Sequence, residues 1–156
     1  MQETILIQTD FRVESLILIK SAIQNNPGRK LNIVLVHGVE LTDSITELLF
    51  FSKHKLLKKV MKEDFETGIN EIRQDFAGNI NSLRIELFTG YNQSAFNNFL
   101  EANKISQIFL ANDYAFKSDY KNSKDLALFI SRSVQKKVEI AWARSEDSYP
   151  QLAMLH

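Results

Sequence analysis

Two polar segments, each at the end of an apolar run, carry the side chains best suited to bind a ligand. Thr9 and Asp10 end the first such run, and Asn112 and Asp113 follow the run 107–111. A carboxylate placed there can accept hydrogen bonds from a ligand amine. The alternative is a local turn or helix-capping role, for which Asp and Asn are also favoured. We take these four residues as the candidate ligand crevice.

His37, which precedes Gly38, could act as a proton shuttle near neutral pH. No serine elbow, adenylyl-transfer signature or paired acid–base motif accompanies it in the sequence. A catalytic His needs a nucleophile or an orienting acid beside it, so a structural role is expected for His37. No catalytic residue is assigned, and the protein is not expected to be an enzyme.

The residue types that hold metals are scarce. The chain has no Cys and three well-separated His. This excludes a disulfide framework, a thiolate nucleophile and Cys-ligated zinc or iron–sulfur sites, and it disfavours a His-based cluster. Neither a metal nor a cofactor is expected.

Glycine loops that cradle phosphates are missing. Neither G-x-G-x-x-G nor G-x-x-x-x-G-K-[ST] occurs in the sequence. None of the five glycines (28, 38, 68, 78 and 90) follows the first or fourth apolar run, where a backbone cradle for phosphate would be needed. Lys117, Lys121 and Lys124 could replace such a cradle by side-chain charge, because Lys binds phosphate as a point charge.

The charge balance points to no polyanionic partner. Lys plus Arg and Asp plus Glu each number 19, so the formal net charge is zero. Neither nucleic acid nor a membrane is therefore expected as a partner. One helical face carries a basic run: Lys53, Lys55, Lys58, Lys59 and Lys62. We expect a solvated face with pairs at Lys59–Glu63 and Lys62–Glu66, the alternative being an anion- or partner-binding stripe.

Five short apolar runs predict the strands that position these residues. They are Thr4–Thr9, Leu31–Val36, Leu83–Thr89, Gln107–Ala111 and Val138–Ala143. Most are almost continuously apolar, as is typical of parallel strands covered on both faces. The last run alternates apolar and polar residues, which indicates an edge strand.

Helical spacing of apolar residues predicts helices between the strands. The segments are 13–25, 43–77, 93–103 and 124–135. Asn92 and Ser123 are the predicted caps of the last two. Gly68 could bend the long second segment, because glycine destabilises a helix interior by about 1 kcal/mol relative to alanine.

Alternating strands and helices predict a three-layer α/β/α open sheet of five mainly parallel strands. Ligands of such sheets bind beyond the carboxyl ends of the strands, where the strand order reverses. Residues 1–144 are expected to form one domain, followed by a tail at 145–156. The N-terminus has no signal-peptide pattern and no apolar run is long enough to span a bilayer, which predicts a cytoplasmic protein.

Over residues 1–144 the chain resembles the universal stress protein family. The matching pieces are the opening strand and aspartate at Ile5–Asp10, the hydrophobic–His pair Val36-His37, and Thr89-Gly90 before a helix. The long segment 43–77 fits the second crossover of that family. The resemblance implies the adenine nucleotide alpha hydrolase-like fold with strand order 3-2-1-4-5.

One departure from that family decides the expected function. ATP-binding members carry a glycine motif after strand four, but its first two glycine positions are Asn112 and Ala115 here, and its end falls near Lys124-Asp125. Asp10 matches the aspartate that contacts the base or ribose end of the nucleotide. The resemblance thus implies a regulatory or stress-response module that is non-catalytic and does not bind ATP. The alternative is a nucleotide or small-ligand sensor with a rebuilt phosphate loop at 112–124.

The resemblance also implies a homodimer, because such proteins commonly pair through the fifth strand. Val138, Ile140 and Trp142 are the predicted interface residues. An exposed strand edge is a liability unless it is covered. A small-molecule ligand near Asp10 is the other expected partner.

Overall fold

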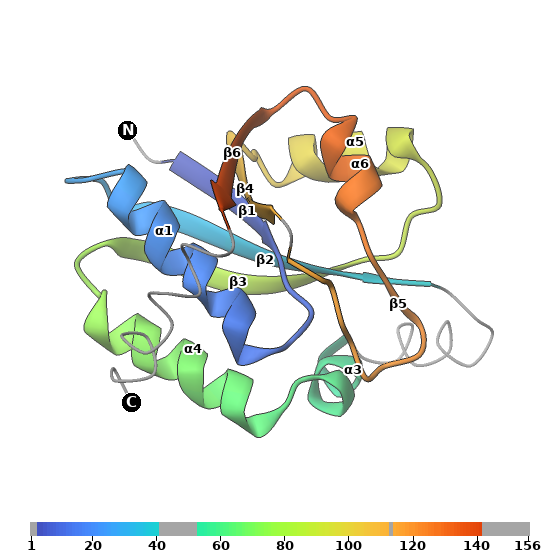
Figure 1. The fold of residues 1–156 in the computed structure, drawn as a ribbon, viewed down its shortest axis with the longest axis horizontal. Helices are drawn as coiled ribbons and strands as arrows, with labels where there is room; N and C mark the ends of the chain where they lie inside the picture. The colour runs from blue at the N-terminus through green and yellow to red at the C-terminus, as the bar shows by residue number, and fades with distance from the viewer. Residues whose placement is uncertain (1–2, 41–52, 113, 142–156) are drawn as a thin grey trace.

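The fold is a central sheet between two layers of helices (Figure 1). A computed structural model of the chain describes residues 3–40, 53–112 and 114–141. The strands are β1 (Glu3–Gln8), β2 (Leu31–Val39), β3 (Ile80–Phe88), β4 (Gln107–Asn112), β5 (Ser123–Lys124) and β6 (Lys136–Ala141). The five longer strands pair in parallel in the order β3-β2-β1-β4-β6.

The predicted fold class and strand order are confirmed, with β6 as the expected fifth strand. The order reverses between β1 and β4, where Ile7 pairs with Phe109. The sequence did not predict β5, a two-residue strand that pairs antiparallel with the end of β2 at Gly38 and Val39. This short pairing holds the segment after β4 against β2, which lies on the opposite side of β1 from β4.

Each face of the sheet has its own helices. The helices are η1 (Val13–Leu16), α1 (Ile17–Asn25), α3 (Lys53–Val60), α4 (Glu63–Asp75), α5 (Gln93–Ala102) and α6 (Ala127–Ser131). In Figure 1, α1 and α4 lie on one face, and α5 and α6 lie on the other. The sequence predicted this order of elements.

Alternation along the strands divides the core into two clusters. Ile5 and Ile7 of β1 pack with α1 and α4, whereas Leu6 between them packs with α5 and α6. All three are completely buried. Successive side chains of a strand point to opposite faces, so an almost continuously apolar strand contributes to both clusters.

Of the local predictions about the helices, the Ser123 cap is wrong. Helix α4 is continuous through the buried Gly68, and the chain breaks before this helix, where Lys62 has an extended backbone. Three acidic residues in the first turn of α4 favour a helix N-terminus there. Ser123 belongs to β5 and does not cap a helix; Asp125 Oδ1 accepts the Ala127 N–H of α6 instead. The predicted cap Asn92 is confirmed, because its side chain accepts the Ala95 N–H at 2.9 Å.

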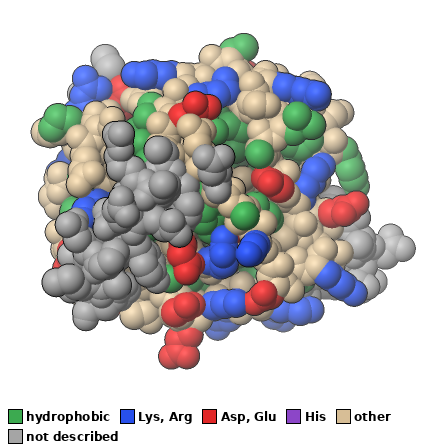
Figure 2. Space-filling model, in the orientation of Figure 1, with side chains coloured by type: hydrophobic (Ala, Val, Ile, Leu, Met, Phe, Trp, Pro, Cys, Tyr) green, Lys and Arg blue, Asp and Glu red, His purple; other side chains and the backbone are tan. Residues whose placement is uncertain are grey.

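Charges of both signs are interspersed on the face of the molecule seen in Figure 2. Lys53 pairs with Glu86 and Lys62 pairs with Asp119. Lys62 therefore has a partner in the segment after β4 and not the predicted Glu66, since the break before α4 removes the continuous helix that the i,i+4 pair needed. No helix among the described residues is long and apolar enough to cross a membrane.

Candidate functional site

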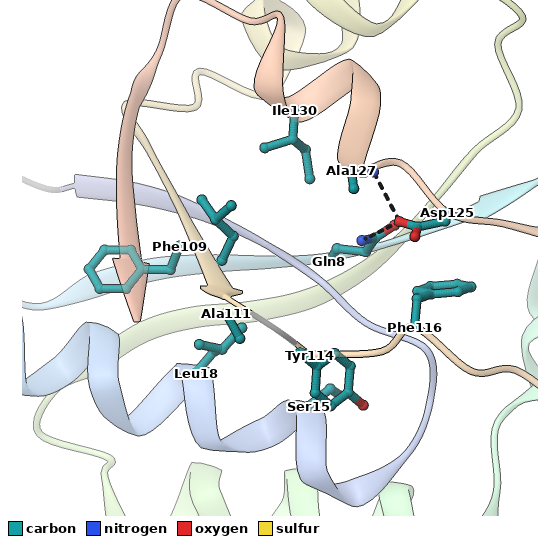
Figure 3. A pocket seen from close by; sticks show the side chains of 11 residues that line it. Gln8, Ser15, Leu18, Phe109, Ala111, Tyr114, Phe116, Asp125, Ala127 and Ile130 are labelled. Carbon is teal, nitrogen blue, oxygen red and sulfur yellow. Dashed lines mark hydrogen bonds between the residues drawn. The ribbon is translucent and has the colours of Figure 1, made fainter. Parts of the chain in front are cut away.

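A small pocket lies at the carboxyl ends of β1 and β4, where the strand order reverses (Figure 3). Its volume is about 90 Å³. Its walls come from β1, η1, α1, β4, α6 and the segments before and after β5. The lining residues are Gln8, Ser15, Leu18, Phe109, Leu110, Ala111, Tyr114, Phe116, Asp125, Ala127 and Ile130. This is the position at which ligands of doubly wound sheets bind.

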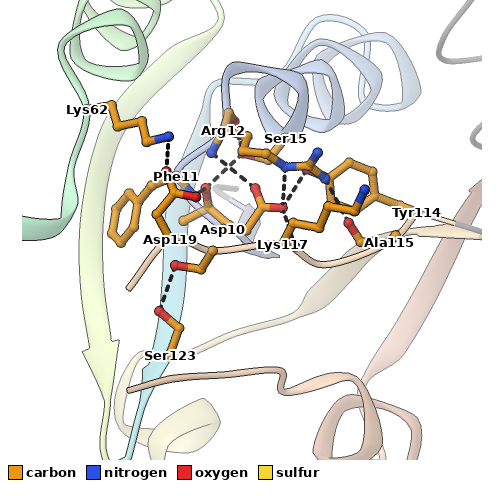
Figure 4. Close-up of polar contacts among 12 residues, drawn as sticks. Asp10, Phe11, Arg12, Ser15, Lys62, Tyr114, Ala115, Lys117, Asp119 and Ser123 are labelled. Carbon is orange, nitrogen blue, oxygen red and sulfur yellow. Dashed lines mark hydrogen bonds and ion pairs between the residues drawn. The ribbon is translucent and has the colours of Figure 1, made fainter. Parts of the chain in front are cut away.

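Asp10 lies beside this pocket with its carboxylate turned into the protein (Figure 4). Its side chain is completely shielded from solvent. Oδ2 accepts hydrogen bonds from the Tyr114 hydroxyl at 2.7 Å and from the Lys117 N–H at 3.1 Å. Oδ1 accepts the Arg12 N–H at 3.1 Å, and Arg12 Nε approaches Oδ2 at 3.0 Å. The carboxylate is therefore neutralised and hydrogen-bonded by the protein itself.

Arg12 and Tyr114 fasten the segment after β4 onto the end of β1. Arg12 donates from Nη2 to the Ala115 carbonyl at 2.7 Å, and its guanidinium lies 4.9 Å from the Tyr114 ring centroid. Burial, together with the hydrogen bond to the Asp10 carboxylate, raises the pKa of Tyr114. The phenol is therefore a neutral donor at physiological pH.

Phe11 adopts a left-handed backbone conformation, with φ of 62°. This conformation is uncommon for a bulky residue, and such strain persists only where the surroundings determine it. The Phe11 N–H donates to Thr9 Oγ1 at 3.0 Å, and the ring packs 4.4 Å from the His37 ring and 5.3 Å from the Phe65 ring. The turn after β1 is thus held by polar and aromatic contacts.

His37 is fully buried and both of its ring nitrogens have partners. Nδ1 lies 2.8 Å from the Thr9 carbonyl oxygen, which can only accept, so Nδ1 carries the proton. Nε2 then accepts from the Ser123 hydroxyl at 2.6 Å, and Ser123 Oγ lies 2.8 Å from Ser118 Oγ. Burial lowers the pKa of His37, against the opposing effects of the Thr9 carbonyl and the Asp10 charge. This chain of hydrogen bonds joins β1, β2 and β5, which is the structural role expected for His37.

The structure does not bring the four predicted crevice residues together in one pocket. Thr9 and Asp10 are buried at the end of β1, and the expected meeting of the two loops is realised by Asp10 and Tyr114. Asn112 is exposed at the end of β4 and does not line the pocket. Asp113 lies outside the described residues. Within the part of the chain that the structure describes, no group of three or more His, Asp or Glu could hold a metal ion.

Sequence reasoning missed the residues that shape the pocket. Gln8 donates from Nε2 to Asp125 Oδ1 at 3.1 Å and accepts the Leu126 N–H. One signal was available, because Gln8 is a polar residue directly after the buried apolar run Ile5–Ile7. Nothing local distinguishes Phe116 or Asp125, which reach the pocket only when the segment after β4 folds back.

The predicted interface strand lies at the sheet edge, beside β4. Val138 and Ile140 are half-buried and pack against the core cluster under α1 and α4. Packing against the core therefore explains, in part, why these two residues are apolar. Trp142 lies outside the described residues.

Comparison with known proteins gives a likeness in structure only. No protein-family profile matches the sequence, and no curated protein is detectably similar to it. The hypothetical protein MJ0577 is 15% identical with a TM-score of 0.56, over 89% of this chain and 95% of that chain. UspA from Lactobacillus plantarum is 12% identical with a TM-score of 0.54, over 88% and 97%.

A third solved structure, a universal stress protein in complex with cAMP, is 15% identical with a TM-score of 0.52, over 88% of this chain and 96% of that chain. At such identities the likeness establishes the fold. The chain has the universal stress protein fold, as the resemblance in its sequence predicted.

Proposed function

We propose that this protein is a non-catalytic regulatory module of the universal stress protein type, which acts as a homodimer in a stress response and does not bind ATP. The fold supports the comparison with that family. The site described above supports the proposal that this protein, unlike the ATP-binding members, does not bind ATP.

The state of the Asp10 carboxylate carries the proposal. A carboxylate that reads the base or ribose of a nucleotide must be free to accept hydrogen bonds from the ligand. Asp10 already accepts from Arg12, Tyr114 and Lys117, and its side chain is fully buried. A nucleotide would have to displace the segment 114–117 and leave buried polar groups unpaired, which is costly.

The size of the pocket supports the same conclusion. About 90 Å³ lies between β1 and β4, whereas sites for larger ligands enclose roughly 300–1,000 Å³. An adenine nucleotide does not fit this space unless the segment after β4 moves.

A nucleotide titration tests the proposal. The melting temperature and the heat of binding are measured with ATP, ADP, AMP and cAMP. We expect no saturable change. A ligand at 100 times its Kd would stabilise the native state by about 2.7 kcal/mol, so a shift of that size with ATP would contradict the proposal.

A second candidate function is a cyclic-nucleotide or small-ligand sensor whose segment 112–124 opens to admit the ligand. A cAMP complex among proteins of this fold favours it. The exposed Lys117 and Lys121 could then contact phosphate, whereas Lys124 Nζ lies 4.8 Å from the Phe129 ring centroid. Binding of cAMP but not ATP in the same titration would favour this function.

A further inference from the structure

We infer that the pocket between β1 and β4 binds a small, uncharged and mainly apolar molecule, no larger than a single ring or a short branched chain. The inference rests on the proposed function, because it names the kind of ligand that such a module would sense in place of a nucleotide.

Most of the pocket wall is hydrocarbon. Leu18 from α1, Phe109 and Ala111 from β4, and Ile130 from α6 face the space, and Phe116 borders it from the segment after β4 (Figure 3). Loosely held water in an apolar space is released when an apolar ligand enters, which favours binding.

The polar groups at one end of the pocket are bonded to one another. Both ends of the Gln8 amide are used, by Asp125 Oδ1 and by the Leu126 N–H. Asp125 Oδ1 also accepts the Ala127 N–H at 3.0 Å. The Gln8 amide and Asp125 Oδ1 therefore offer a ligand little hydrogen bonding.

The polar groups at the other end are engaged in the same way. Ser15 Oγ donates to the Arg12 carbonyl at 2.8 Å and lies 2.8 Å from Thr9 Oγ1. The Tyr114 hydroxyl donates to Asp10. A polar ligand would lose its bonds to water without replacing them, and the cost of that loss excludes strongly polar molecules.

The charges around the pocket select against ions. Asp125 at the rim would repel a phosphate or carboxylate, and Asp10 beneath Tyr114 is already neutralised by Arg12. An organic cation would lose its hydration against the mainly apolar wall, which disfavours it as well. An uncharged molecule avoids both the repulsion and the loss of hydration.

The volume limits the size of the ligand. The pocket holds about 90 Å³, roughly the share of three molecules in liquid water, and an apolar cavity of about 150 Å³ can take up benzene. The pocket is smaller than that closed cavity, but the exposed Asp125 and Ala127 in its wall show that it opens to solvent. One small ring is therefore the upper limit, with part of the ligand projecting from the mouth of the pocket.

The test uses toluene as the probe and benzoate as its charged counterpart. Binding to the full chain is followed by changes in the backbone amide NMR spectrum, with AMP titrated in parallel. We expect saturable shifts at Gln8, Ala111 and Ala127 with toluene. Benzoate is expected to bind at least about tenfold more weakly, because its carboxylate must be desolvated.

Ala111→Leu is the variant that occupies the pocket, and Ala102→Leu is its matched control on the exposed end of α5. We expect Ala111→Leu to abolish the toluene shifts and Ala102→Leu to leave them unchanged. Should Ala111→Leu fail to fold, Ala127→Leu narrows the pocket from a solvent-exposed helix position.

Three results would overturn the inference: no saturable toluene binding, benzoate binding as tightly as toluene, or equal toluene binding by the pocket variant and the control. AMP or ATP binding would instead contradict the proposed function. If toluene still bound in the pocket, the inferred ligand class would stand, so the two failures are distinguishable.

Discussion

At the scale of single residues, the site is organised around one buried carboxylate. The sequence makes Asp10 a candidate ligand-binding residue. In the structure its carboxylate instead accepts hydrogen bonds from Arg12, Tyr114 and Lys117. Its hydrogen bonds therefore contribute to holding the segment after β4 against the end of β1.

Replacing Tyr114 with Phe tests this role. The change removes the shortest hydrogen bond to a fully buried carboxylate, and hydrogen bonds to charged groups contribute about 1.5–3 kcal/mol. We expect a loss of about that size in the free energy of unfolding, measured with urea. Tyr91→Phe is the control, because Tyr91 is 73% exposed. Equal effects of the two substitutions would contradict a structural role for the Tyr114 hydroxyl.

The second prediction at this scale concerns pH. Burial lowers the pKa of His37 below its ordinary value of 6.5, so the unfolded chain binds a proton that the folded chain does not. Stability is therefore greatest above pH 6.5 and falls as the pH decreases towards the folded-state pKa, by up to about 1.4 kcal/mol per pH unit for one group.

Urea unfolding at pH 7.5 and at pH 5.5 measures this effect. His37→Gln should reduce the difference between the two pH values, whereas His54→Gln, at an exposed position of α3, should preserve it. An NMR titration of the His37 ring in the wild-type chain provides an independent check. A His37 pKa at or above 6.5 would contradict the prediction.

At the scale of elements, the short strand β5 decides how the site closes. It pairs with the end of β2, where Ser123 reaches His37 and Leu126 packs into the core under α5 and α6. The pairing is possible because position 38 has no side chain. A Cβ on Gly38 would lie 2.5 Å from the Lys124 carbonyl oxygen and 2.7 Å from Leu126 Cδ2.

Gly38→Ala is therefore expected to push β5 away from β2. Crowding of this kind costs about 1–3 kcal/mol, and the Glu40 N–H, which donates to the Asn122 carbonyl, should lose protection from hydrogen exchange. Gly78→Ala is the control, because an added Cβ there meets nothing within 4 Å. Unchanged protection of Glu40 in Gly38→Ala would show that β5 tolerates the extra atom.

At the scale of the whole molecule, β6 ends the sheet at one side. Among the described residues its only strand partner is β4, and we propose that its outer edge pairs with a second copy of the chain. Unpaired strand edges favour such pairing.

A homodimer formed through β6 predicts twice the mass of one chain by light scattering. It also predicts slow hydrogen exchange at amides all along 136–141, because both edges of the strand would be paired. In a monomer every second amide of this strand would exchange rapidly. A monomeric mass with alternating protection would contradict the dimer.

The features that could be predicted from the sequence are those that depend on residues close together in the chain. Runs such as Leu31–Val36 predicted buried strands, because a stretch that is apolar on both faces needs cover on both. Asn92 was recognisable as a cap, because its role depends on residues three positions away. At Gly68 the packing of the buried face of α4 outweighs the backbone preference of glycine, so the helix continues.

The sequence by itself determined the parallel sheet, because this follows from periodicity and connectivity. The family resemblance supplied the strand order, and with it the end of the sheet at which a ligand would bind. Only the tertiary structure decided what occupies that end. Tyr114 and Lys117 are more than 100 positions from Asp10 in the chain. Hydrogen bonds across such a separation leave no periodic pattern in the sequence, and they form only when the segment after β4 folds back over β1.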